Sequence, residues 1–225
     1  MQISVIIPAL NEAAALPAAL ASLRCQRPHE VIVVDGGSTD ATPELAAAEA
    51  DRVVTGVRGR AAQMNLGAKH ATADALLFLH ADCTLEDGAL AEASRLLQRP
   101  QVIAGCFRMT VPHRRLLYRS IDACATARAR IFGIIYGDQG LFLRRETFEQ
   151  LGGFPELKLM EDVFLSLRLR RRGRVVVGSS RIYVSARRWQ KVGVVRQTVR
   201  NWGLTALAAA GVHPDRLARF YPAVR

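Results

Sequence analysis

The first hundred residues alternate between short apolar runs and alanine-rich runs, and this alternation constrains the fold more than any other feature. The apolar runs predict strands at 3–9, 30–36, 52–56 and 75–82. The runs between them predict helices at 12–23 and 61–70, and a third helix with Pro43 in its first turn and a cap from Thr39, Asp40 or Thr42. Alternation at this spacing predicts an α/β fold with a parallel sheet covered by helices on both faces.

The second half is less regular. Residues 101–115 indicate a strand outside the strand–helix alternation, and 116–134 indicate a helix rich in Ala and Arg. Further strands of mixed direction are expected at 140–145 and 174–189, before a last helix at about 195–210 that Gly211 and Pro214 end. Because the chain contains no internal repeat and no low-complexity linker, we expect one continuous domain over residues 1–225.

The net charge of +11 is concentrated in the second half. Residues 1–100 carry 8 Lys/Arg against 12 Asp/Glu, whereas residues 101–225 carry 23 against 8. The two halves are therefore expected to face different partners. No apolar stretch reaches the ~20 residues of a membrane span. Four cysteines without metal-binding spacing indicate reduced, mostly buried thiols and a cytoplasmic location.

Acidic side chains follow three of the predicted strands. Glu12 lies after the first strand, Asp35 ends the second, and Asp82 ends the fourth. In open α/β sheets, ligands bind at the carboxyl ends of the strands. Carboxylates there can accept hydrogen bonds from a base or ribose and can hold a divalent metal against a pyrophosphate. Each acid alone is more simply a helix cap or part of a solvated loop, but three at equivalent positions indicate a nucleotide site.

The segment 137–173 carries a second group of acids, with Asp138 near its start and Glu161–Asp162 at the entrance of a helix. An acidic pair there is compatible with a general base, and also with simple stabilisation by the helix dipole. Asp138 and Gln139 are compatible with an acceptor pocket or with turn chemistry. Gly152–Gly153 is most simply a helix end and turn.

Six segments together resemble family 2 glycosyltransferases, in the order that family shows. They are SVIIPALNE (4–12), VIVVDGGSTD (31–40), GRAAQMNLGA (59–68), FLHAD (78–82), GDQGLFLRRETFEQLGGFPE (137–156) and MEDVFLSLRLRRRG (160–173). The HAD variant and the SARRW segment (185–189) most resemble a bacterial branch labelled rSAM/selenodomain-associated transferase 2. The resemblance implies a GT-A fold, with a Rossmann-like, mostly parallel central sheet flanked by helices and a mixed acceptor-side half.

The resemblance also implies donor-side roles by motif position. The nucleotide-sugar-binding half is expected at 1–100, where Pro8, Glu12 and Asp35 contact the base and ribose. Arg60 is expected near the base or pyrophosphate, and Asp82 matches the metal ligand of the family's DxD motif. The cofactor is then Mg²⁺ or Mn²⁺, held mainly by Asp82, the donor phosphates and water.

One position departs from that motif, because His80 replaces its first Asp. Histidine can ligate Mn²⁺ but suits Mg²⁺ poorly. His80 therefore has two interpretations: it is a metal ligand, or it has no role in metal binding.

The acceptor-binding half is expected at 101–225, including the C-terminal helix. Asp162 matches the family's general base with Glu161 beside it, and Arg188 and Trp189 match a motif at the donor or acceptor mouth. The expected activity is metal-dependent, inverting transfer of a sugar, from UDP by family frequency, to a small-molecule or lipid-linked hydroxyl acceptor. A nucleotidyltransferase and a non-catalytic nucleotide-sugar-binding protein are the alternatives, although PALNE (8–12) lacks the Gly-rich, basic loop of the former.

The basic second half has three interpretations. Arg168 to Arg174 form a solvated helix end, attract an anionic acceptor, or act with Arg187, Arg188, Lys191, Arg196 and Arg200 on acidic lipid headgroups. The third interpretation places the protein at the inner membrane face, with the apolar side of the last helix against the surface. Nucleic acid is not an expected partner, because no recognition motif or interleaved stacking aromatics accompany the basic residues.

Overall fold

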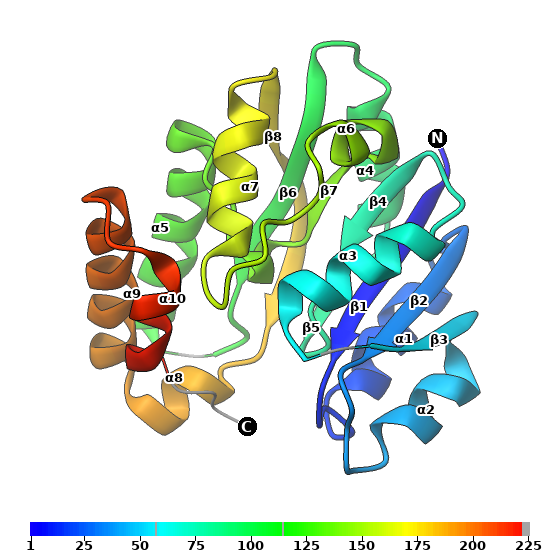
Figure 1. The fold of residues 1–225 in the computed structure, drawn as a ribbon, viewed down its shortest axis with the longest axis horizontal. Helices are drawn as coiled ribbons and strands as arrows, with labels where there is room; N and C mark the ends of the chain where they lie inside the picture. Colours follow the sequence, from blue (N-terminus) through cyan, green and yellow to red (C-terminus); the bar gives the residue numbers. More distant parts are fainter. Residues whose placement is uncertain (57, 114, 222–225) are drawn as a thin grey trace.

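One mixed sheet runs through both halves of the chain (Figure 1). The computed structural model describes residues 1–56, 58–113 and 115–221. Its eight strands have the order β3-β2-β1-β4-β7-β6-β8-β5. The strands are β1 (Ile3–Ala9), β2 (Glu30–Asp35), β3 (Arg52–Thr55), β4 (Ala75–Phe78), β5 (Cys83–Leu85), β6 (Val102–Thr110), β7 (Leu141–Arg144) and β8 (Arg174–Val184).

The first four strands in spatial order are parallel, as the alternation predicts. β7 is antiparallel to both β4 and β6, β8 is parallel to β6, and β5 is antiparallel to β8. The expected mixed direction of the second half is therefore confirmed. Because β7 lies beside β4, the two halves share one sheet with no break between them.

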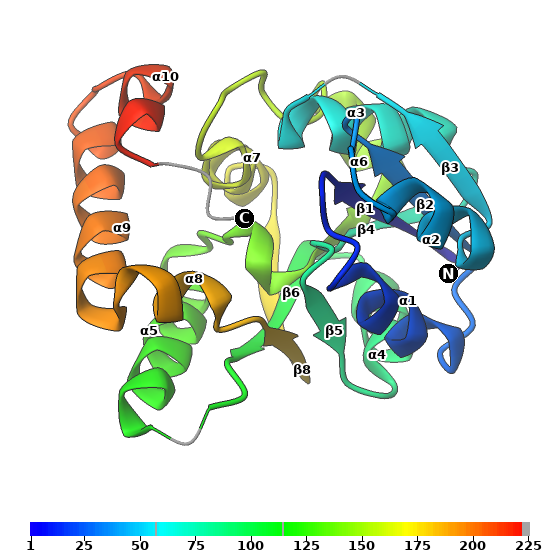
Figure 2. The same ribbon diagram turned by 90° about the horizontal axis from the view of Figure 1, so that it is seen from below.

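Helices cover both faces of the sheet, and three more follow β8 on the side away from β3 (Figures 1 and 2). The helices are α1 (Leu16–Arg24), α2 (Thr42–Glu49), α3 (Arg60–His70), α4 (Ala89–Leu97), α5 (Leu116–Phe132), α6 (Arg145–Gln150), α7 (Glu161–Arg170), α8 (Arg187–Val192), α9 (Val194–Ala209) and α10 (Pro214–Leu217), with 3₁₀ turns η1 (Gly137–Gln139) and η2 (Ala218–Phe220). No helix within the described ranges has the length and apolarity that crossing a membrane requires.

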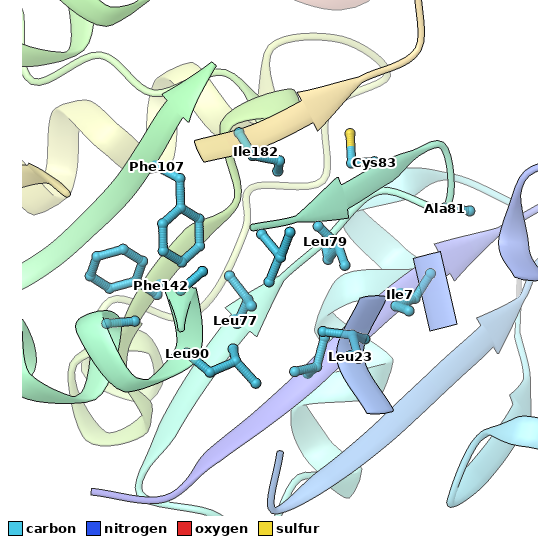
Figure 3. Packing of buried hydrophobic residues seen from close by; sticks show 14 of the residues in the cluster. Ile7, Leu23, Leu77, Leu79, Ala81, Cys83, Leu90, Phe107, Phe142 and Ile182 are labelled. Carbon is cyan, nitrogen blue, oxygen red and sulfur yellow. The ribbon is translucent and has the colours of Figure 1, made fainter. Parts of the chain in front are cut away.

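Two cores pack on opposite faces of the sheet. Adjacent residues of a strand point to opposite faces, and Ile6 and Ile7 accordingly belong to different cores. Figure 3 shows the core of Ile7, in which Leu23 and Leu77 belong to the same cluster as Phe107 and Phe142 from the second half. All seven residues of β1 are buried, which explains its uninterrupted apolar run.

Several predicted boundaries are wrong. The strand expected at 101–115 ends at Thr110. The first helix begins at Leu16, not at residue 12, because the amides of Glu12 and Ala13 bond side chains of the next loop. The fourth strand ends at Phe78, not at residue 82, where the chain leaves β1 and turns towards β5. β8 ends at Val184, so the end of the strand expected at 174–189 is helical. Pro214 begins α10.

Two smaller expectations also differ. Ala41, not Thr39, Asp40 or Thr42, occupies the N-cap position of α2, although the Asp40 carboxylate accepts the Thr42 amide at 3.0 Å. All four cysteines are free thiols, as expected, but two of them are exposed.

Candidate active site

The loops after β1 and β2 form one hydrogen-bonded rim at the carboxyl end of the sheet. The Asn11 amide donates to Ser38 Oγ at 2.9 Å, and the Asn11 side chain accepts the Thr39 amide at 2.8 Å. The Glu12 amide donates to Thr42 Oγ1 at 2.8 Å. Asn11 holds a left-handed backbone with φ of 54°, which Asn tolerates better than most residues. The rim is therefore a fixed structure.

Asp35 lies at the floor of this rim and is only 4% exposed. Its carboxylate accepts the amides of Gly37 and Ser38, and the Ser38 hydroxyl at 2.5 Å. Pro8, buried in β1, lies beside Val34 of β2. Pro8 and Asp35 thus lie at the predicted sheet edge but outside the pocket described next.

A pocket of about 140 Å³ opens between the sheet edge, α7 and the C-terminal helices. Both halves of the chain contribute charged or polar side chains to it. Six residues singled out in the sequence line it, namely Arg60, His80, Asp82, Asp138, Asp162 and Trp189. The structure therefore brings donor-side and acceptor-side candidates together around one space.

The acidic pair at the start of α7 separates into two environments. Glu161 is 2% exposed and forms an ion pair with Arg60, Nε to Oε1 at 3.0 Å. Burial raises the pKa of Glu161 against the pull of Arg60, while Glu161 raises the pKa of Arg60 and keeps the guanidinium charged. Asp162 instead lines the pocket. Of the two carboxylates, the Asp162 carboxylate is placed to meet a ligand.

Backbone amides on both sides orient the Asp162 carboxylate. Oδ2 accepts the Gly137 amide at 2.5 Å, and Oδ1 accepts the Val163 amide at 2.7 Å. Met160, just before the pair, has a left-handed backbone with φ of 65°. Such a conformation costs about 1–3 kcal/mol in a non-glycine residue and concentrates at functional sites.

Gly137 fits between this carboxylate and His80. A Cβ at Gly137 would lie 2.5 Å from His80 Nε2 and 3.3 Å from Asp162 Oδ2. His80 and Asp162 can therefore lie this close to the η1 backbone only because residue 137 is a glycine without a Cβ. The sequence alone predicts no role for Gly137 beyond its position before Asp138.

Asp138 and Gln139 have different surroundings within η1. Burial raises the pKa of Asp138 to about 6, with Asp162 and Asp82 adding to the increase and Arg128 opposing it. Its Oδ1 is buried and has no hydrogen-bond partner among the described residues. Gln139 is fully buried, and its Oε1 accepts from Arg128 at 2.6 Å. Asp138 lines the pocket and Gln139 supports the turn beneath it.

The C-terminal helices close the pocket from the other side. Arg187 Nη2 lies 3.0 and 2.9 Å from the two carboxylate oxygens of Glu12, and 3.6 Å from Asp82 Oδ2. Trp189 is 7% exposed, lines the pocket, and has a buried indole N–H without a partner among the described residues. The side chain of Arg188, on the same helix, lies outside the described residues.

The sequence interpretation missed several pocket residues. Tyr136, Asn201, Thr205 and Tyr221 line the pocket, and no sequence motif singles them out. Arg187 contacts Glu12 beside the pocket, whereas the sequence suggests only a lipid contact for it. The Tyr136 hydroxyl lies 2.8 Å from Thr205 Oγ1, and Arg128 stacks over its ring. No local pattern marks these residues, because they come from three separate segments, namely the residue before η1, the helix α9 and the residue after η2.

The side chains that line the pocket offer only some of the ligands that a divalent cation needs. Carboxylate oxygens are the ligands that Mg²⁺ and Mn²⁺ favour. Asp82, 30% exposed, and the unpartnered Oδ1 of Asp138 line the same pocket. Within the described ranges, no group of three or more His, Cys, Asp and Glu side chains could hold a metal. The residues therefore fit a cation that takes its other ligands from phosphate and water.

Curated relatives match parts of this chain. The O-antigen chain rhamnosyltransferase RfbN of Salmonella typhimurium is 28% identical over 194 residues, which cover 75% of this chain and 61% of the relative. A PGL/p-HBAD biosynthesis glycosyltransferase of Mycobacterium bovis is 42% identical over 91 residues, 36% of each chain. The chain thus spans less than two thirds of the length of these relatives.

Solved structures share the fold. TarS (residues 1–349) of S. aureus has a TM-score of 0.65 at 21% identity, covering 83% of this chain and 61% of that chain. The mannosyltransferase PcManGT of Pyrobaculum calidifontis, solved with GDP-Man and Mn²⁺, has a TM-score of 0.63 at 25% identity, covering 79% and 56%. These likenesses confirm the expected GT-A fold.

The family model described as "Glycosyl transferase family 2" matches residues 4–153. That match extends from β1 to the turn after α6 and includes Arg60, Asp82 and Asp138. It covers most of the chain and agrees with the order of the sequence motifs. The chain belongs to glycosyl transferase family 2.

Proposed function

We propose that the protein transfers a sugar, with inversion, from a nucleotide-sugar to a hydroxyl group of an acceptor, with Asp162 as general base. One observation carries the proposal. Asp82, after β4, and Asp162, at the start of α7, line the same pocket although 80 residues separate them in the chain. A donor-side and an acceptor-side carboxylate around one space is the arrangement that inverting transfer needs.

The acceptor step follows from how Asp162 is held. Its oxygens receive amide hydrogen bonds from Gly137 and Val163, which fix the carboxylate before an acceptor arrives. A hydroxyl in the pocket can donate to Asp162, which takes the proton as the hydroxyl oxygen attacks the anomeric carbon. Fixing the attack direction lowers the entropic part of the barrier.

The leaving nucleoside diphosphate needs positive charge. Arg60 lines the pocket with a side chain 40% exposed, and Glu161 holds it at the entrance of α3. We propose that Arg60 stabilises the developing phosphate charge, which makes Glu161 a positioning residue. Asp82 and Asp138 would hold a Mg²⁺ or Mn²⁺ ion, which supplies further charge neutralisation when bound.

We propose a UDP-sugar as the donor to be tested first, and membership of the rSAM/selenodomain-associated transferase 2 branch on the HAD and SARRW segments. PcManGT was solved in complex with GDP-Man and TarS in complex with UDP-GlcNAc, so a donor panel should contain both nucleotides. Pro8, Glu12 and Asp35 form the rim where base and ribose would bind. Arg188 and Trp189 on α8 would face the acceptor, whereas we propose Asp138 for the cation in place of its expected acceptor role.

The test begins with thermal shifts for UDP- and GDP-sugars, with Mg²⁺ or Mn²⁺, because a bound donor raises the unfolding midpoint. Release of nucleoside diphosphate from the stabilising donor then measures turnover. Asp162→Asn should lower turnover by about 10²-fold or more while the donor-induced shift remains. Asp74→Asn, an exposed carboxylate at the opposite end of β4, is the matched control. Full turnover in a folded Asp162→Asn protein would exclude Asp162 as the base.

A further inference from the structure

Exposed apolar side chains are concentrated on two helices that lie far apart in the sequence. Among the described residues, eleven large hydrophobic side chains are exposed, and eight of them lie on α5 and α9. These eight residues, called the α5/α9 face below, are Leu116, Leu117, Ile131, Phe132, Val195, Val199, Trp202 and Leu207. Apolar patches of this kind mark interaction sites on soluble domains.

The two helices form one surface. α5 and α9 contact each other, and they stand side by side at the edge of the molecule farthest from β3 (Figures 1 and 2). On α9, Val195, Val199 and Trp202 recur at helical spacing and are 64%, 61% and 58% exposed. The α5/α9 face therefore belongs to two helices that pack against each other.

The opposite side of α9 has a different role. Asn201, Leu204 and Thr205 line the pocket that contains Asp162. One helix thus presents Asn201 and Thr205 to the candidate active site and exposed apolar side chains to the outside. Whatever binds the α5/α9 face lies one helix diameter from that pocket.

The charges around the face identify the kind of partner. The helices α5, α8 and α9 carry eight Lys or Arg and one acidic residue. That residue, Asp122, is half-buried and accepts the Val111 amide. Arg119, Arg130 and Arg196 are exposed between the apolar side chains, and Arg170 bonds the carbonyl of Phe132. Apolar side chains interspersed with cations and almost no acids match an anionic lipid surface.

We propose that the α5/α9 face docks on an anionic membrane surface, with its apolar side chains in the headgroup region and its arginines on lipid phosphates. A second copy of this chain is a poorer occupant, because two identical cationic faces would repel each other. The proposal does not depend on the transferase activity. The basic residues of the second half thus lie on helices that are far apart in the sequence but adjacent in the fold.

Trp202 provides a direct readout. The chain has two tryptophans, and Trp189 is 7% exposed whereas Trp202 is 58% exposed. Vesicles of phosphatidylcholine mixed with phosphatidylglycerol should shift the emission of Trp202 to shorter wavelength and carry the protein in flotation. Phosphatidylcholine vesicles alone should bind much more weakly, and added salt should reduce the binding to anionic vesicles.

Two pairs of substitutions test the two components. Val199→Ser with Leu207→Ser should weaken anionic-vesicle binding by at least about tenfold, because each apolar side chain buried on docking contributes more than 1 kcal/mol. Arg130→Gln with Arg196→Gln should weaken it by roughly 30-fold, from about 1 kcal/mol for each charge. Leu167→Ser, an exposed apolar residue on α7, is the matched control and should leave binding unchanged.

Circular dichroism establishes that each variant is folded, and all the substituted side chains are exposed. Three results would overturn the proposal. They are no binding of the parent protein to anionic vesicles, equal binding of the parent and the Val199→Ser/Leu207→Ser protein, and a parent dimer in light scattering that those substitutions dissociate without any vesicle binding. The effect of Asp162→Asn on turnover tests the proposed function alone, and vesicle binding of that variant should be unchanged.

Discussion

At the scale of single residues, Gly137 shows how one missing side chain sets the geometry of the site. Gly137→Ala would place a Cβ 2.5 Å from His80 Nε2, so the His80 ring or the η1 turn must move. The Asp162 carboxylate depends on the same Gly137 amide. We expect a loss of about tenfold to a hundredfold in kcat, because small displacements of positioned groups have effects of that size. Steady-state kinetics with the donor selected above measures it.

Gly203→Ala is the matched control for that substitution. Gly203 lies within α9, has a helical backbone and has open space where a Cβ would lie. It should retain activity and gain about 1 kcal/mol in unfolding free energy from the better helix propensity of Ala. Equal kcat for Gly137→Ala and the parent protein would show that the site tolerates the displacement.

Asp122 is expected to make stability fall as pH rises. Burial raises its pKa from 3.8 to about 6, although the Val111 amide bond opposes the shift. A raised folded-state pKa means that the folded protein favours the protonated acid, so stability is lost as pH rises from 3.8 through about 6. Asn keeps an acceptor for Val111 without the charge. Asp122→Asn should therefore gain on the order of 1–3 kcal/mol at pH 8.

Urea unfolding at pH 8 and pH 4 measures that difference. The gain should shrink towards pH 4, where the parent carboxyl is largely protonated in the folded state. The pH dependence distinguishes the charge effect from any general stabilisation by the amide. A gain of the same size at both pH values would contradict the assignment to Asp122.

The sequence indicates the candidate site residues better than it indicates their roles. Asp82 and Asp162 belong to motifs, and both line the pocket. Adjacent residues on a helix point about 100° apart, so motif position alone cannot tell which of Glu161 and Asp162 faces a ligand. The packing of α7 on the sheet decides it. The role of Arg187 depends on a contact with Glu12 across 175 residues, which no local pattern encodes.

At the scale of elements, most strands and helices could be predicted because their apolar periodicity is local. The misplaced boundaries fall where tertiary hydrogen bonds override that periodicity. Residues 12–15 have helical composition, yet Thr42 and Asp40 bind the amides of Glu12 and Ala13 and delay α1. Residues 79–82 are apolar enough for a strand, yet they leave the sheet to place Asp82 at the pocket.

One such tertiary contact joins α4 to an irregularity in β8. The register between β6 and β8 shifts between Cys106 and Arg108, and the extra residues of β8 include Ser179 and Ser180. Glu92 accepts the amides of Ser179 and Ser180, at 2.7 and 2.8 Å, and the Ser179 hydroxyl at 2.5 Å. At the bulge, the Glu92 carboxylate therefore accepts the backbone amides that a neighbouring strand would otherwise bind.

Glu92→Gln should destabilise the protein at neutral pH. Burial alone raises the pKa of Glu92, but hydrogen bonds from Ser179 and Ser180 outweigh it and lower the pKa from 4.5 to about 2. A lowered folded-state pKa gives stability that is present above pH 4.5 and lost as pH falls towards about 2. We expect a loss on the order of 2 kcal/mol at pH 7, since the amide still offers one oxygen.

Glu86→Gln is the control, because Glu86 accepts the Arg181 amide of the same strand at an exposed hydrogen bond. It should change the unfolding free energy by less than about 1 kcal/mol. Denaturant unfolding at pH 7 and pH 3 should show the Glu92→Gln difference narrowing at the lower pH. A difference that grows on acidification would reverse the sign argued here.

At the scale of the whole molecule, the two halves are joined by a shared hydrophobic core as well as by strand pairing. Their cores merge where Leu77 and Phe142 share a cluster, and β4 pairs directly with β7. These contacts support our proposal that residues 1–225 form one domain. Charged side chains also join the halves, and the Arg187–Glu12 contact spans 175 residues of the chain.

Arg187→Gln should loosen the C-terminal helices from the sheet edge. Its guanidinium nitrogen binds both oxygens of Glu12 from the first turn of α8, with side chains 29% and 18% exposed. A charge-assisted contact of this burial contributes about 1–2 kcal/mol after solvent screening. We expect that loss in unfolding free energy at low salt, together with faster amide hydrogen exchange in α8 and α9.

Arg145→Gln separates this effect from a general loss of positive charge. The Arg145–Glu149 pair spans 3.9 Å on one exposed helix and joins no distant elements, so its loss should change stability by less than about 0.5 kcal/mol. Glu12→Gln should reproduce the faster exchange of α8 and α9, because it removes the other partner of the same contact. If neither Arg187→Gln nor Glu12→Gln changes exchange there, packing around Trp189 and Tyr118 must hold the C-terminal helices in place without the ion pair.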